Sequence, residues 1–160
     1  MRAHDGGKII RMNGDISEDG DQPGERHRRP DGVSRASVEA LGSLSEAFET
    51  VEQARGHLYA FHQLSGRADL LLGEAVEKLR TAGHREHADL VDSEIVGRNV
   101  IPDCWTFQIV EAYNATYYRP FADVEEQVRQ KIAGGRTHLY EAEMKEERRT
   151  HGHPAHRAGP

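Results

Sequence analysis

The sequence predicts an all-α protein, a small helical bundle with one long N-terminal helix, flanked by a disordered N-terminal leader and a disordered C-terminal tail. Three observations favour this class. Apolar residues recur at helical spacing through residues 37–147, period-2 alternation never lasts more than a few residues, and Val, Ile and Thr are sparse relative to Ala, Leu, Glu and Arg. We therefore expect helices and no sheet.

The composition divides the chain into three parts. Residues 1–36 are rich in Gly, Asp, Arg and Pro and hold few side chains that could pack, which predicts a disordered leader. Residues 148–160, "RRTHGHPAHRAGP", are polar and interrupted by Gly and Pro, which predicts a disordered tail containing His and Arg. Residues 37–147 are expected to form one helical domain.

The first helix of this domain is predicted to be much longer than the others. Small and apolar residues follow one another in steps of three and four without interruption: Val51, Ala54, Leu58, Phe61, Ser65, Ala68, Leu72, Ala75 and Leu79. A straight helix over 37–82 would be roughly 70 Å long, which exceeds the width of a domain of this size. The helix is expected either to break near Gly56 or Gly66, or to project and need a partner chain.

Local signals set the remaining helix boundaries. The first helix is predicted to start near Ser37 or at the capping-box pattern Ser43–Glu46, and to end at Gly83. Pro120 is expected to break or kink the chain after the third helix, and Gly134 to end the fourth. The predicted short helices cover residues 84–98, 104–118, 121–133 and 137–147.

The segment "PDCWTFQIVEAYNATYYRPF", residues 102–121, holds the only Trp, the only Cys and six of the ten aromatic residues. At ~100° per residue its apolar side chains fall on two faces. The first face, expected to be core, contains Trp105, Ile109, Val110, Tyr113 and Tyr117. The second lies nearly opposite and contains Phe107, Glu111, Asn114 and Tyr118.

The second face predicts a binding surface or an interface, because a helix with one core face does not need aromatic residues on the other side. Glu111 lies between Phe107 and Tyr118, and burial there would require an Arg, a metal or a raised pKa. Arg98 and Arg119 are the candidate cationic partners. A further hypothesis places an aromatic ligand pocket around Trp105.

The ten histidines raise a metal-binding alternative. A di-metal helical bundle uses Glu-x-x-His on two helices, and this pattern does not occur in the sequence. The tail histidines lack a rigid frame to fix their geometry. The residues that could supply imidazole or carboxylate ligands to a transition metal are His62, His87, Glu94, Glu111, His138 and Glu141.

Charge and composition argue against several function classes. Residues 37–147 carry eleven Lys and Arg against twenty Asp and Glu, a net of −9, and such an acidic domain repels nucleic-acid phosphates. No apolar run approaches the ~18 residues that a membrane span needs. A lone Cys104 and an N-terminus without a signal-peptide pattern favour a cytoplasmic protein.

The long apolar seam of the first helix predicts that the protein self-associates. A set of short helices would leave part of that seam exposed to water, which favours a homodimer. We expect a non-catalytic protein without a cofactor that acts by self-association or by binding another protein. The alternative is a metal-binding helical bundle with redox chemistry.

Overall fold

The computed structural model describes residues 22–159 and contains helices and turns, with no strand among these residues. The predicted all-α class is thereby confirmed. The described chain forms two compact units: unit 2 is Pro30–Gly135, and unit 1 combines the described residues up to Arg29 with those from Arg136 onward. The predicted disorder of residues 1–21 lies outside the described residues.

Helix α1 spans Arg35–Thr81 as a single uninterrupted helix of 47 residues, roughly 70 Å long. The expected breaks at Gly56 and Gly66 do not occur, because each glycine is surrounded by strong helix formers and costs only about 1 kcal/mol relative to alanine. The helix begins earlier than predicted. The N-cap is Ser34, whose Oγ accepts a hydrogen bond from the backbone N–H of Ser37 at 3.1 Å.

Helix α2, Arg85–Glu94, follows the turn at Gly83 and is shorter than predicted. The chain leaves the helix after Glu94 and reaches Gly97, whose φ of 69° belongs to the left-handed region. The connection to the next helix contains an isolated bridge between Ile101 and Cys104.

The third and fourth predicted helices form one continuous helical path. Helix α3, Thr106–Tyr113, leads into the π-helical segment η3, Asn114–Tyr118, and then into α4, Arg119–Ala133. Of the predicted break or kink at Pro120, the break does not occur, and the irregularity is the π-turn just before the proline. Proline cannot donate to the carbonyl four residues back and its ring crowds that carbonyl, and the wider π-turn just before it relieves this conflict. Gly134 ends α4 in the left-handed conformation, as predicted.

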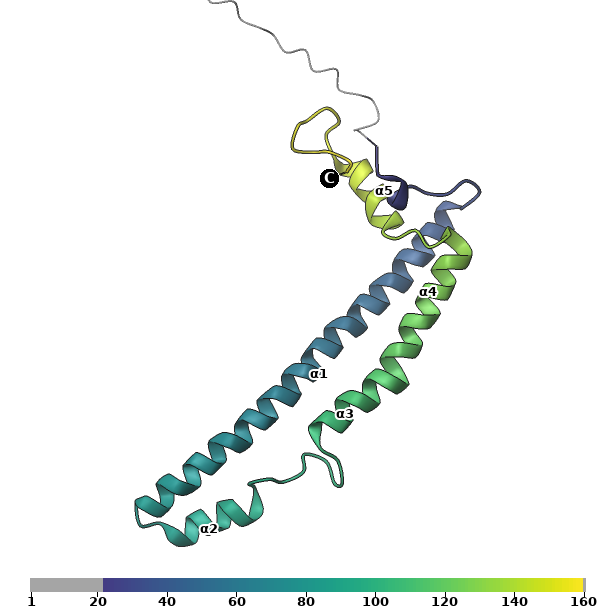
Figure 1. Ribbon diagram of the computed structural model, residues 1–160. Coiled ribbons are helices and arrows are strands. Elements are labelled where there is room, and N and C mark those ends of the chain that lie inside the picture. The colour runs from purple at the N-terminus through teal and green to yellow at the C-terminus, as the bar shows by residue number, and fades with distance from the viewer. Residues whose placement is uncertain (1–21, 160) are drawn as a thin grey trace, which may run out of the picture. The chain divides into compact units, whose positions relative to one another are not determined.

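Within unit 2, α1 forms one layer, and α2, α3 and α4 return along it to form the second (Figure 1). Two layers of helices enclose little interior, and the buried apolar residues are correspondingly few: Val38, Leu41, Val51, Val76, Ala88, Val110 and Ala133. None of the described helices combines the length and apolar composition needed to cross a bilayer.

Unit 1 contains helix α5, Leu139–Arg148, and the 3-10 turn η2, Glu25–His27. Hydrogen bonds join its two chain segments: His27 Nδ1 to Thr137 O at 2.8 Å, Arg136 Nη1 to Arg28 O at 2.6 Å, and Arg29 Nε to Glu143 Oε1 at 2.6 Å. The expected disordered tail has a defined turn, in which the Thr150 N–H donates to His156 Nδ1 at 3.2 Å.

Candidate interaction site

The face of α1 that packs inside unit 2 is largely polar. We call it the polar seam; its members recur in steps of three, four or seven, and they are Ser45, Phe48, Glu52, Arg55, Tyr59, His62, Asp69, Val76 and Arg80. Four of its hydrogen bonds join α1 to the returning segments: Ser45 Oγ to Glu125 Oε1 at 3.2 Å, His62 Nδ1 to Thr106 Oγ1 at 2.7 Å, Gly97 N to Asp69 Oδ1 at 2.7 Å, and Arg80 Nη2 to Asp92 Oδ2 at 2.7 Å. Specific polar contacts therefore hold the two layers together.

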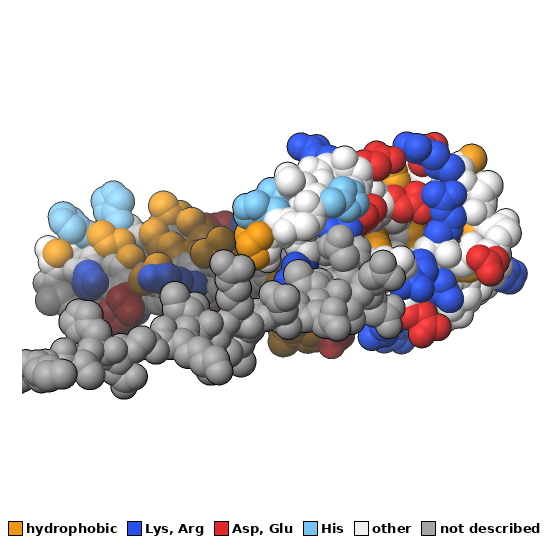
Figure 2. Space-filling model, turned by 90° about the horizontal axis from the view of Figure 1, so that it is seen from above, with side chains coloured by type: hydrophobic (Ala, Val, Ile, Leu, Met, Phe, Trp, Pro, Cys, Tyr) orange, Lys and Arg blue, Asp and Glu red, His pale blue; other side chains and the backbone are white. Residues whose placement is uncertain are grey.

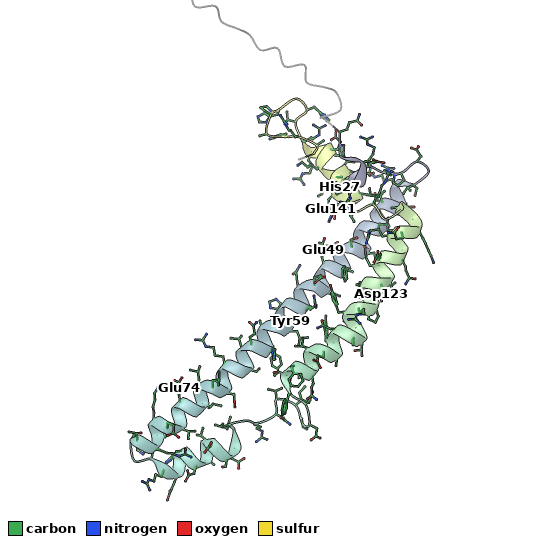
Figure 3. All side chains as sticks on the ribbon, viewed as in Figure 1. His27, Glu49, Tyr59, Glu74, Asp123 and Glu141 are labelled. Carbon is green, nitrogen blue, oxygen red and sulfur yellow. The ribbon has the colours of Figure 1, made fainter. Side chains whose placement is uncertain are left out.

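Arg55 is the centre of the contact between α1 and η3. Its Nε donates to Asn114 Oδ1 at 2.8 Å, and its guanidinium lies 4.1 Å from the ring centroid of Tyr118. Asn114 Nδ2 donates to the hydroxyl of Tyr59 at 3.1 Å, and the Tyr118 hydroxyl donates to Glu52 Oε1 at 2.5 Å. Tyr59 is labelled in Figure 3, on the part of α1 beside which the return helices run. The side chains of Glu52, Arg55, Tyr59, Asn114 and Tyr118 are thus joined in one network of contacts, which holds η3 against α1.

The hydrogen bond to Glu52 raises the pKa of the Tyr118 hydroxyl, with smaller contributions from desolvation and from the negative charge of Glu52. The folded pKa is above the ordinary value of about 10, so the stability from this bond is fully present below pH 10. It is expected to be lost as the pH rises through the raised pKa. Helical circular dichroism during thermal unfolding, measured between neutral and strongly alkaline pH, checks this. Tyr118→Phe should show a smaller alkaline loss than the wild type, and equal losses would contradict the prediction.

The predicted second aromatic face is only partly buried. Asn114 and Tyr118 pack on α1, whereas Phe107 is 41% exposed with its ring 5.5 Å from that of Trp105. Glu111 is exposed and makes no hydrogen bond or ion pair within the described chain, so its burial by a partner chain or a ligand stays a prediction. Arg98 instead lies 3.9 Å from Glu94 in an exposed pair.

The predicted core face is wrong at both ends. Val110 is buried, but Trp105 is 61% exposed and Tyr117 is 51% exposed. Trp105 lies before the first helical turn in an extended conformation. Its backbone N–H donates to Gln108 Oε1 at 2.8 Å. Tyr117 lies inside the π-segment, where the phase of ~100° per residue no longer holds.

The predicted pocket around Trp105 corresponds to a cleft of about 360 Å³ between α1 and the connection from α2 to α3. Asp69, Arg98 and Phe107 are among the residues that line it. Asp69 accepts the Gly97 N–H, and Arg98 lies in an exposed pair with Glu94, so a ligand for this cleft stays a prediction.

The candidate metal ligands of unit 2 do not converge. No three of His62, His87, Glu94 and Glu111 offer ligand atoms within 4.8 Å of one another in the described chain. His62 bonds to Thr106, and the His87 ring lies 6.2 Å from that of His84. His138 and Glu141 belong to unit 1, where the His138 ring lies 5.8 Å from that of His27.

A second seam runs along α1 on the side away from the polar seam. We call it the outer seam; every member is exposed and follows the last by three or four residues, and the members are Ala54, His57, Phe61, Leu64, Ala68, Leu71, Ala75 and Lys78. The two seams are separated by roughly 150° around the helix. Figure 2 shows hydrophobic side chains gathered over α1 on the left of that view. The largest members, Phe61, Leu64 and Leu71, are 42%, 63% and 51% exposed.

The seam predicted from sequence lies between these two faces. Four of its nine residues belong to the outer seam: Ala54, Phe61, Ala68 and Ala75. The other five form a flank that is buried or half-buried: Val51, Leu58, Ser65, Leu72 and Leu79. None of them belongs to the polar seam, which sequence periodicity missed because most of its residues are polar or charged.

No protein-family model, curated protein or solved structure matches the chain.

Proposed function

We propose that the protein is a self-associating helical protein in which the outer seam of α1 binds the outer seam of a second copy. The observation that carries this proposal is an exposed three-four repeat extending over more than three heptads, with Phe61, Leu64 and Leu71 at its centre. Heptad repeats of this length are typical of helices that pair along their whole contact. Apolar residues aligned in this way on an exposed face mark an interaction site.

The arrangement of the two seams supports a partner outside unit 2. The return helices use the polar seam, at a contact that includes Asn114, Tyr118 and Asp92, so they leave the opposite face of α1 uncovered. A second copy presents the same face, and pairing about a two-fold axis buries both faces together. The protein's role in this proposal is association without catalysis, and a cytoplasmic location stays a prediction from composition.

Replacing Leu64 and Leu71 together by glutamate is expected to convert the dimer to a monomer. Each copy would bring two unpaired carboxylates into an apolar contact, so the dissociation constant should rise about 100-fold or more. Light scattering after size-exclusion chromatography over a concentration series measures this. The matched control is Leu70→Glu, because Leu70 is 74% exposed and belongs to neither seam. The control should dimerise like the wild type.

A wild-type chain that stays monomeric at every concentration would contradict the proposal. The test includes a chain without residues 1–21, because that segment is the other candidate to cover the outer seam. Dimerisation only after its removal would mean that the N-terminal segment occupies the seam in the full chain. Dimerisation of both forms, lost in the double glutamate variant, supports the proposal.

A further inference from the structure

We infer that the two copies of α1 pair antiparallel, with Ala68 of one copy opposite the partner's Leu71. This inference rests on the proposed self-association and adds the orientation and the register. It comes from three properties of the outer seam: the order of large and small residues, the position of Lys78, and the charges that flank the seam.

The order of residue sizes favours the antiparallel alignment. When Ala68 faces the partner's Leu71, the adjacent layer brings Leu64 opposite the partner's Ala75. Each of these layers then combines one large and one small side chain, so the helix axes keep a constant separation and the layers fill evenly. The next layer brings Phe61 opposite the partner's Lys78, whose aliphatic stem can cover the ring while its ammonium group reaches water.

A parallel in-register pair would place each residue opposite its own copy. Its layers would alternate between Ala68 with Ala68 and Leu71 with Leu71, which would be underfilled and overfilled in turn. It would also bring the two copies of Lys78 together at one end, and like charges at such positions disfavour that alignment.

The charges beside the outer seam complement one another only in the antiparallel pair. Arg67 and Glu74 occupy the same flank of the seam, each one residue before a seam alanine. In an antiparallel coiled coil this flank faces its own copy, so Arg67 lies opposite the partner's Glu74, and the two-fold axis produces this pair twice. In the parallel pair, Arg67 would instead face the partner's Leu72.

Both side chains are available for this contact. Arg67 is exposed and makes no ion pair in the described part of the chain. Glu74, labelled on α1 in Figure 3, has one contact, to Lys78 at 3.8 Å, and the two side chains are 64% and 81% exposed. An exposed pair at this distance is weak and can rearrange when a partner arrives.

Disulfide trapping in the full chain tests the orientation. In a Cys104→Ser background, one chain carries Leu64→Cys and a second, distinguishable by mass, carries Ala75→Cys. The two are mixed in equal amounts and oxidised with glutathione. The antiparallel register brings residue 64 opposite residue 75 and separates like positions by roughly 16 Å along the helix, beyond the reach of a disulfide. The expected product is therefore the mixed dimer.

Crosslinked homodimers of either variant, in place of the mixed product, would establish the parallel pair and overturn the inference. A dimer that forms no disulfide would overturn the register. If light scattering shows that the variants and the wild type are monomers, the proposed function itself fails, so the two failures are distinguishable.

A charge exchange provides an independent measurement. Arg67→Glu should raise the dissociation constant about tenfold, because it places like charges together twice in the dimer. Adding Glu74→Arg to the same chain should restore most of the affinity. A double variant that binds no better than the single variant would contradict the Arg67–Glu74 contact.

Discussion

Replacing Arg129 with methionine is expected to destabilise unit 2 by about 3 kcal/mol, because it removes the counter-charge of a buried carboxylate. Glu125 is 7% exposed, and both of its oxygens lie 3.3 Å from Arg129 Nε. Arg129 Nη1 also donates to Gly135 O at 2.9 Å. Without the guanidinium, Ser45 would be the one remaining hydrogen-bond donor to the Glu125 carboxylate among the contacts described. Urea denaturation at a fixed protein concentration measures the change.

Two further variants identify the cause of this loss. Arg98→Met removes an exposed Glu–Arg pair of the same i, i+4 spacing and should change stability by less than about 0.5 kcal/mol. Replacing both Glu125 and Arg129, as Glu125→Leu with Arg129→Met, removes the buried charge together with its partner. The double variant is expected to be more stable than Arg129→Met alone. A double variant that is less stable would mean that packing, rather than the uncompensated charge, dominates the effect.

Replacing Val76 with aspartate is expected to destabilise unit 2 by about 3–5 kcal/mol and to detach α2 from α1. Val76 is 2% exposed and lies on the polar seam between Asp69 and Arg80, both of which bond to the segment that contains α2. The substitution would remove apolar contact and bury a carboxylate whose nearest cation on the same face, Arg80, is already paired with Glu77, Asp89 and Asp92. Hydrogen exchange followed by mass spectrometry, which reports opening segment by segment, measures the detachment.

Leu70→Asp is the matched control for this prediction. Leu70 lies on the same helix and is 74% exposed, so the same charge there should change stability by less than about 0.5 kcal/mol. Equal loss of protection in α2 for both variants would contradict the assignment of Val76 to the contact between α1 and α2.

Sequence periodicity predicts the helical class and the long helix well, because the many strong helix formers among the 47 residues of α1 outweigh its internal glycines. The first residue of α1 cannot be predicted in the same way. Several serines near residue 37 carry N-cap chemistry, and the choice of Ser34 depends on the local geometry that lets its Oγ reach the Ser37 N–H. Propensity alone does not distinguish them.

The intramolecular face of α1 could not be predicted from apolar residues. Glu52, Arg55, Asp69 and Arg80 resemble solvent-exposed positions in the sequence, and each has a defined partner across the layer in the structure. Pairing of polar groups depends on which segments return beside the helix, and that information is not local. The apolar signal therefore locates the outer seam and its flank and leaves the packed face undetected.

A helical wheel gives the wrong burial for Trp105 and Tyr117 in residues 102–121 for a related reason. A helical wheel assumes one turn geometry throughout, but Trp105 precedes the helix and η3 changes the phase before Tyr117. Pro120 was a signal of irregularity at this point. Whether a proline produces a break or a π-turn depends on the contacts of the preceding turn, which here are those of Asn114 and Tyr118 with α1.

The π-turn also has a consequence for the chain length between two contacts. Arg119 N bonds to Asn114 O, five residues back, so η3 contains one residue more than an α-helical path would need. Five residues of π-helix turn through nearly the same angle as four residues of α-helix, so the extra residue leaves the faces of α3 and α4 aligned. Removing a residue such as Ala115 should therefore convert η3 to an ordinary α-helical turn and keep Glu125 beside Ser45 and Thr106 beside His62. The π-turn is thus a point at which the chain length between these two contacts can change by one residue.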